Sequence, residues 1–110
     1  MSDRDRKVLQ KILKEISFFE KDVNIAFDEF INNEILKRAT AMTLINIGEL
    51  ARLLSDECKK SMPDIPFDAI IATRNVAAHG YNELRFDNIW QTIQIHIPEF
   101  KKKISGVLKG

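Results

Sequence analysis

The sequence predicts an all-α protein folded as a single domain, residues 1–110. Apolar residues recur at three- and four-residue steps in several long segments, and alternation of period two is nowhere sustained. The four glycines and three prolines fall where helices would end or bend. Since a chain of 110 residues supports one modest core, we expect an up-and-down bundle of four or five helices with short connections.

The first predicted helix begins at Ser2 or Asp3, either of which can cap it, and ends near residue 22. Apolar residues at helical spacing give it a buried stripe. These residues are Val8, Leu9, Ile12, Ile16, Phe19 and Val23. The stretch after them either continues the helix or forms a short one, and Asn32 or Asn33 can cap the helix that follows.

The second long helix has the clearest pattern, with one face that persists for about five turns. This face carries Leu36, Thr40, Leu44, Ile47, Ala51 and Leu54. Gly48 lies inside the helix, where glycine costs up to ~1 kcal/mol relative to alanine. We therefore expect another backbone to approach closely at Gly48.

Pro63 and Pro66 must interrupt the helical pattern, after which Pro66 can start a third helix that runs to His79. Gly80 is expected to end this helix in a left-handed conformation. The last helix runs from about residue 87 and should be kinked at Pro98. Helices this amphipathic leave apolar surface exposed on a small domain, so we expect a homodimer.

Composition and missing motifs exclude several classes of protein. Cys58 is the only cysteine, which excludes an internal disulfide and a zinc site built on several thiolates. No segment reads as a signal peptide or a membrane span, so the protein is predicted to be cytoplasmic and to have no membrane partner. A net charge of +1 gives no overall field to attract nucleic acid, and glycine-rich phosphate loops and metalloprotease motifs are absent.

The candidate site lies in the stretch RNVAAHGY, residues 74–81. On an ideal helix Asn75 and His79 are one turn apart, so the amide can hydrogen-bond the imidazole and fix its tautomer. Arg74 lies about 140° around the helix from His79, so the two do not face the same way in one chain. The arginine side chain is long, however, and a helix that frays into Gly80 can swing the imidazole toward it. Alternatively, a symmetry-related helix in a dimer can bring a second Arg and His to form one shared site.

Arginine and histidine together are a minimal set for cutting RNA without a metal. A histidine with a pKa near ~6.5 can take a proton from a ribose 2′-hydroxyl or deliver one to the leaving 5′-oxygen. A guanidinium would offset the charge that develops on the phosphorane. A second interpretation remains open, because cations such as Arg74 and His79 also stabilise the negative end of a helix without any catalytic role. His96, the other histidine, is interpreted as a surface or packing residue.

Beyond these local patterns, nearly the whole chain resembles the HepT toxins of bacteria and archaea. They belong to the HEPN superfamily, the "higher eukaryotes and prokaryotes nucleotide-binding" helical domains. Four stretches resemble the family in order and spacing. They are MSDRDRKVLQKILKEI, LKRATAMTLINIGELARLLS, MPDIPFDAIIATRNVAAHGY and IWQTIQIHIPEFKKKI. The R-x-x-x-x-H motif becomes fairly specific because x-Y follows it, IPFDAI precedes it and INIGE lies upstream.

The resemblance implies a symmetric homodimer whose paired motifs form an endoribonuclease cleft that needs no metal and no cofactor. Arg74 and His79 match the catalytic positions of the motif, and Asn75 matches the polar residue that follows the arginine. Tyr81 matches the tyrosine to which a minimal nucleotidyltransferase, the cognate antitoxin, adds AMP. The resemblance thus implies a toxin with an RNA substrate and an antitoxin partner.

This chain departs from the family pattern directly after the motif histidine. Many relatives have Asp after the motif histidine, where this chain has Gly80, and this difference implies a looser helix end or a weaker site. Glu49 matches a frequent family glutamate and is interpreted as a buried partner for Arg38, Arg74 or a backbone amide, with catalysis as the weaker alternative. An alternative function also stays open: a non-catalytic HEPN subunit that presents a substrate or nucleotide to a nucleotidyltransferase.

Overall fold

The computed structural model describes residues 1–109, apart from the side chains of Asp22 and Ala78. Its long helices are α1 (Asp3–Asp22), α3 (Glu34–Arg52), α5 (Phe67–His79) and α7 (Ile97–Lys109). Shorter helical pieces are α2 (Phe27–Ile31), α4 (Asp56–Lys60), α6 (Phe86–Gln91) and the 3₁₀ turn η1 (Tyr81–Glu83). Between residues 1 and 109 there is no strand, so the prediction of an all-α bundle is confirmed.

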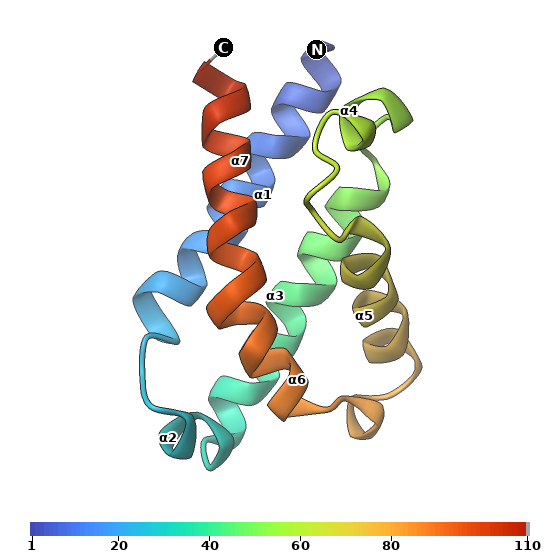
Figure 1. The fold of residues 1–110 in the computed structure, drawn as a ribbon. Helices are drawn as coiled ribbons and strands as arrows, with labels where there is room; N and C mark the ends of the chain where they lie inside the picture. Colours follow the sequence, from blue (N-terminus) through green and yellow to red (C-terminus); the bar gives the residue numbers. More distant parts are fainter. Residues whose placement is uncertain (110) are drawn as a thin grey trace.

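The long helices run alternately up and down (Figure 1). Helix α3 packs against both α1 and α5, and α7 packs against α1. Both chain ends lie at the same end of the bundle, whereas the end of α5 and the turn η1 lie at the opposite end (Figure 1). The RNVAAHGY stretch is therefore remote from both termini.

Side-chain caps explain where the first helices begin. The Ser2 hydroxyl accepts a hydrogen bond from the Asp5 amide at 3.1 Å, and Asn33 Oδ1 accepts one from the Leu36 amide at 3.0 Å. Helix α1 ends at residue 22, as predicted. The segment between α1 and α3 forms the separate short helix α2, which settles one of the two predicted alternatives.

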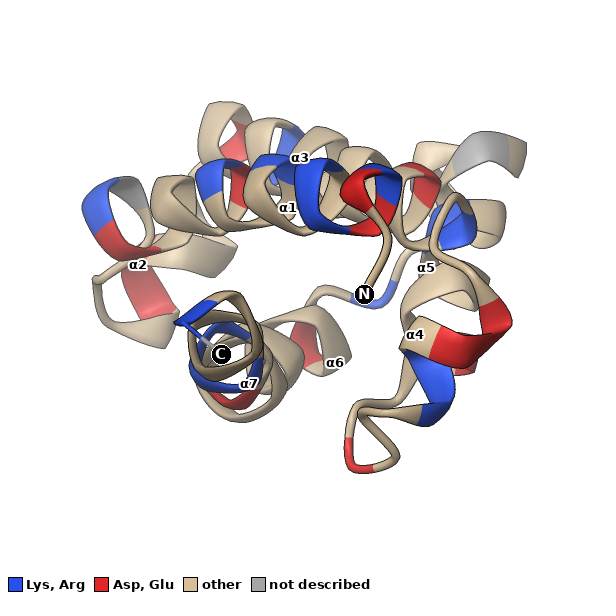
Figure 2. Cartoon of the chain, turned by 90° about the horizontal axis from the view of Figure 1, so that it is seen from above, with Lys and Arg blue, Asp and Glu red and all other residues tan. Residues whose placement is uncertain are grey.

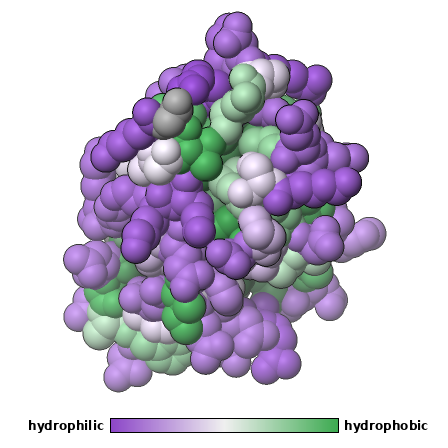
Figure 3. Space-filling view, turned by 45° about the horizontal axis from the view of Figure 1, so that its top comes forward, coloured by the Kyte–Doolittle hydropathy of each residue, from purple (hydrophilic) through white to green (hydrophobic). Residues whose placement is uncertain are grey.

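The core is built from the predicted apolar stripes. Fully buried side chains of α1, α3 and α7 meet along the bundle axis. They include Leu9, Ile12, Ile16, Ile47, Phe100 and Ile104. Leu36, at the start of the predicted α3 stripe, is only partly buried. Apolar side chains also reach the surface in separate patches bordered by polar residues (Figure 3).

Helix α4 was not predicted from the sequence. It has five residues, too few for a hydrophobic period, and Ser55 caps it by accepting a hydrogen bond from the Cys58 amide at 3.1 Å. Asp5 of α1 holds this cap in place. Its carboxylate accepts hydrogen bonds from the Ser55 amide at 2.9 Å and the Ser55 hydroxyl at 2.6 Å.

Two predicted helix ends differ in detail. Helix α5 begins at Phe67 and ends at His79, with Pro66 as the residue before it. The left-handed conformation predicted for Gly80 is wrong, because Gly80 is extended, with φ 169° and ψ 133°. The peptide carbonyl of Val76 still accepts a hydrogen bond from the Gly80 amide at 3.2 Å, so the helix closes without a left-handed residue.

The irregularity expected at Pro98 lies in the turn before it. Residues Thr92–His96 form a π-helical segment, η2, which joins α6 to α7. Proline lacks an N–H group, and its ring collides with the carbonyl four residues earlier in a regular α-helix. A widened turn ahead of Pro98 relieves both problems, since a π turn changes the hydrogen-bond register.

Candidate active site

Arg74 is anchored where α5 crosses α3. Its side chain is half-buried, and its Nε is enclosed and forms an ion pair with Oε1 of Glu49 on α3. Its Nη1 donates a hydrogen bond to Oδ1 of Asn75 at 2.9 Å. Of the three partners expected for Glu49, it pairs with Arg74. Glu49 also forms an ion pair with Arg52, Oε1 to Nη1, at 3.4 Å.

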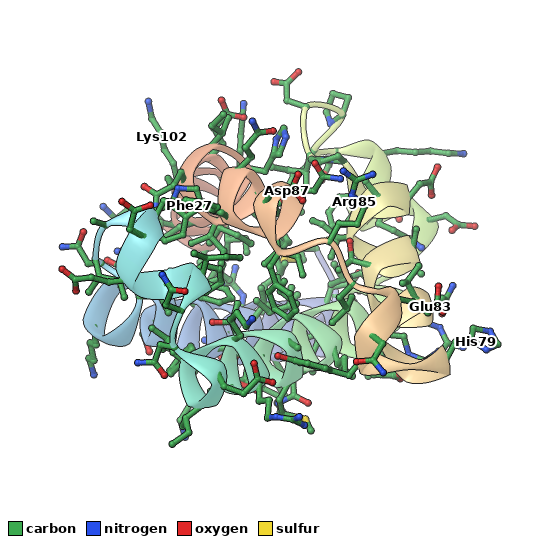
Figure 4. All side chains as sticks on the ribbon, turned by 90° about the horizontal axis from the view of Figure 1, so that it is seen from below. Phe27, His79, Glu83, Arg85, Asp87 and Lys102 are labelled. Atoms are coloured by element: carbon green, nitrogen blue, oxygen red, sulfur yellow. The ribbon has the colours of Figure 1, made fainter. Side chains whose placement is uncertain are left out.

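His79, unlike Arg74, is exposed to solvent. It is the last residue of α5, and its imidazole points away from the bundle into solvent (Figure 4). Among the described residues it has no hydrogen-bond partner for its side chain, so the predicted bond from Asn75 is absent. The Oδ1 of Asn75 instead accepts from Arg74.

Arg74 and Asn75 are thus brought together, but His79 is not brought to Arg74 within one chain. Arg74 faces α3, and His79 projects outward from the end of α5 (Figure 4). This arrangement agrees with the roughly 140° offset expected from helical geometry. Within one chain the two side chains therefore point in different directions.

Tyr81 lies in the η1 turn directly after α5, but its side chain folds back onto α3. The Arg38 guanidinium stacks over the Tyr81 ring, 4.5 Å from the ring centroid. The ring centroid of Phe86, on α6, lies 5.4 Å from that of Tyr81. The hydroxyl is buried and has no hydrogen-bond partner of standard geometry in the described part of the chain. The predicted AMP acceptor is therefore covered in this conformation.

Burial raises the pKa of Tyr81 above its ordinary value, and the neighbouring Glu34 carboxylate raises this pKa further. The same contact with Tyr81 lowers the pKa of Glu34, with Lys37 and Arg38 contributing in the same direction. Glu34 also forms an ion pair with Arg38, Nε to Oε1, at 3.1 Å. Glu34 and Arg38 therefore form a polar cover for the tyrosine that the sequence did not reveal.

Lys and Arg are mixed with Asp and Glu along the helices in the view of Figure 2. No helix within residues 1–109 is long and apolar enough to cross a membrane. The described side chains also contain no cluster of three or more His, Cys, Asp or Glu residues placed to hold a metal ion.

Comparisons with known proteins agree on one family. Residues 9–107 match the model of the family described as "Ribonuclease HepT-like". A Methanocaldococcus jannaschii protein named "Putative RNase MJ1380" is 30% identical, over 97% of this chain and 100% of its own length. "Probable ribonuclease HepT" of Thermococcus cleftensis is 24% identical, over 99% of this chain and 100% of its own.

A further relative, named "Putative RNase TTE0752", comes from Caldanaerobacter subterraneus and is 31% identical over 94% of both chains. No solved structure matches this chain significantly. The family match covers most of the chain, including the whole of α5 with Arg74 and His79. The chain belongs to the HepT-like ribonuclease family.

Proposed function

We propose that this protein is a metal-independent endoribonuclease toxin of a toxin–antitoxin pair. The observation that carries the proposal is the intact R-x-x-x-x-H motif at the end of α5, with an anchored arginine and an exposed histidine, in a chain of the HepT-like ribonuclease family. RNA is the substrate, and Arg74, His79 and Asn75 are the catalytic residues.

The chemistry needs only groups that this site contains. His79 removes the proton from a ribose 2′-hydroxyl, and the oxygen attacks the adjacent phosphorus. The bond from phosphorus to the 5′-oxygen breaks, and a histidine returns a proton to that leaving oxygen. The products are a 2′,3′-cyclic phosphate and a 5′-hydroxyl end. Arg74 stabilises the charge on the phosphorane, and Asn75 holds the Arg74 guanidinium.

In this proposal a homodimer supplies a second arginine and histidine to one shared site. Ile35 and Met42 are 83% and 57% exposed on the outer face of α3, seven residues apart and in line with Glu49. We take this face of α3 as the proposed interface because both large apolar side chains are exposed on it. Glu49 lies on this face and is paired to Arg74, so a second copy bound here would lie close to Arg74.

Tyr81 is the proposed site at which a minimal nucleotidyltransferase antitoxin adds AMP. The modification would place a phosphate and a nucleoside two residues from His79. In the conformation described, the Tyr81 hydroxyl is buried, so the η1 turn must open before the hydroxyl can attack a nucleotide. The antitoxin therefore acts on an opened form of this turn.

Induced expression in a bacterial host tests the proposal. Wild-type protein should arrest growth and fragment cellular RNA, whereas His79→Ala should do neither, and co-expression of the cognate nucleotidyltransferase should restore growth with AMP on Tyr81. Equal growth and intact RNA with both folded proteins would overturn the nuclease proposal and favour a non-catalytic subunit.

A further inference from the structure

Two neighbouring residues of α3, Gly48 and Glu49, meet the same residue of α5, Arg74. We propose that this pair positions Arg74 for RNA cleavage, Gly48 by admitting the base of the side chain and Glu49 by orienting its guanidinium. This inference rests on the proposed function. Neither residue is placed in contact with RNA, so both are positioning residues.

Gly48 is a steric requirement for this arrangement. A Cβ atom at Gly48 would lie 2.5 Å from Cβ and 3.2 Å from Cγ of Arg74, and 3.3 Å from the carbonyl oxygen of Ile70. The first two atoms belong to the stiff base of the side chain, and the third is backbone. The crowding therefore cannot be relieved by swinging a flexible side-chain end, and any larger residue must push α5 or Arg74 away.

Glu49 contacts the Arg74 side chain further from the backbone, at the guanidinium. It forms its ion pair at Nε, the nitrogen at the inner edge of the guanidinium. Nη1 is directed to Asn75, at 2.9 Å. Nη2 has no partner among the described residues, so the outer edge of the planar group is left for a phosphate oxygen. The ion pair at Nε and the hydrogen bond at Nη1 restrict the orientation of the guanidinium before substrate arrives.

A direct chemical role for Glu49 fits the structure less well. Its carboxylate contacts two guanidinium groups, that of Arg74 and that of Arg52 at 3.4 Å. A carboxylate engaged in this way is poorly placed to accept a proton from RNA. Its negative charge also opposes the approach of a polyanion, so its benefit must come through Arg74.

The Glu49→Gln variant should therefore have an unusual kinetic signature. Removing a negative charge near the cleft should leave the KM for a short RNA unchanged or lower it. Releasing Arg74 from its fixed plane should lower kcat by about 10- to 100-fold, the size of effect expected from misplacing a catalytic group by roughly 1 Å. A residue that served only to stabilise the fold would change neither constant well below the unfolding temperature.

Glu20→Gln is the matched control. Glu20 forms an inter-helical ion pair with Lys101, between α1 and α7, at 2.7 Å, and its side chain is 50% exposed compared with 44% for Glu49. The purified protein variants should be compared on one fluorescent RNA oligonucleotide. We expect Glu20→Gln to keep the wild-type kcat. If Glu49→Gln keeps it as well, the inference is overturned.

A double-mutant cycle tests whether Glu49 works through Arg74. In an Arg74→Lys background, which lacks Nε, Glu49→Gln should cause little further loss of kcat. An equal loss in both backgrounds would show that Glu49 acts independently of Arg74 and would overturn the inference. Wild-type cleavage that does not depend on His79 would instead overturn the proposed function itself, so the two failures are distinguishable.

Discussion

Arg74 packs so tightly onto Gly48 that a methyl group there would lie 2.5 Å from the Arg74 Cβ. Helices α3 and α5 are thus in close contact at the residue proposed to bind the phosphate. The glycine that weakens α3 as a helix is the one that lets α5 seat the arginine. Stability and activity are therefore linked at one position.

Gly48→Ala should destabilise the protein by about 1–3 kcal/mol, because overcrowding at a packed contact outweighs the gain in helix propensity. Gly106→Ala is the control, since Gly106 lies inside α7 with nothing within 4 Å of an added Cβ. That substitution should stabilise by up to ~1 kcal/mol. Urea denaturation measures both, and two equal stabilisations would show that the contact with Arg74 is not tight.

Asp5→Asn should lower the free energy of unfolding by about 1–3 kcal/mol at neutral pH. The Asn side chain replaces one carboxylate oxygen with an NH₂ group, and this buried donor would face the amide or hydroxyl of Ser55, which are donors themselves. Asp3→Asn, in the same first turn but exposed, is the control and should have a much smaller effect. Denaturation curves for the three proteins give the comparison.

The effect of Asp5 should also depend on pH. The hydrogen bonds from Ser55 lower the pKa of Asp5 below its ordinary value, so its contribution to stability is present above that ordinary value and is lost as pH falls through the lowered pKa. The stability difference between wild type and Asp5→Asn should therefore shrink below about pH 4. A difference that stayed constant down to acid unfolding would contradict the assigned hydrogen bonds.

Tyr81 is the only tyrosine, so absorbance at alkaline pH reports its ionisation alone. Its midpoint should lie above the ordinary value of about 10, because burial raises the pKa and Glu34 adds to it. The stability contributed by the neutral phenol is present below the unfolded pKa and is lost as pH rises through the folded pKa. Glu34→Gln should lower the midpoint only partly, and an ordinary midpoint in wild type would mean that the hydroxyl is exposed.

Met42→Lys should convert the proposed dimer into monomers while leaving the fold intact, because it puts a charge in the exposed stripe of α3. Ile95→Lys is the control, since Ile95 is 55% exposed but lies on the η2 segment. Sedimentation equilibrium gives the mass of each protein. Dimers that persist in Met42→Lys and dissociate in Ile95→Lys would place the interface elsewhere.

Helical periodicity was enough to predict the architecture. The stripes on α1, α3 and α7 and the caps at Ser2 and Asn33 are local patterns, so they could be read directly. Helix α4 was missed because five residues carry no period, and its cap depends on Asp5, which is 50 residues away. The left-handed conformation expected of Gly80 was wrong. Gly80 is extended and leads into η1, and its amide still donates a hydrogen bond to the Val76 carbonyl at the end of α5.

The sequence proposed residues for the candidate site, and the structure shows that their contacts were only partly predictable. Helical geometry correctly separated Arg74 from His79, and Gly48 correctly indicated a close approach, which is made by α5. The choice of Arg74 as the partner of Glu49, and the cover of Glu34 and Arg38 over Tyr81, depend on how α3 meets distant segments. Spacing along the chain contains no information about those encounters.

The most direct test of the central claim is cleavage of RNA by purified protein in the presence of EDTA, with His79→Ala and His96→Ala compared. His96 is the only other histidine and is also exposed, so it controls for the loss of an imidazole. Wild type and His96→Ala should produce fragments with 2′,3′-cyclic phosphate ends, and His79→Ala should be slower by roughly 100- to 10,000-fold. Equal cleavage by both histidine variants, or cleavage that EDTA abolishes, would contradict the account.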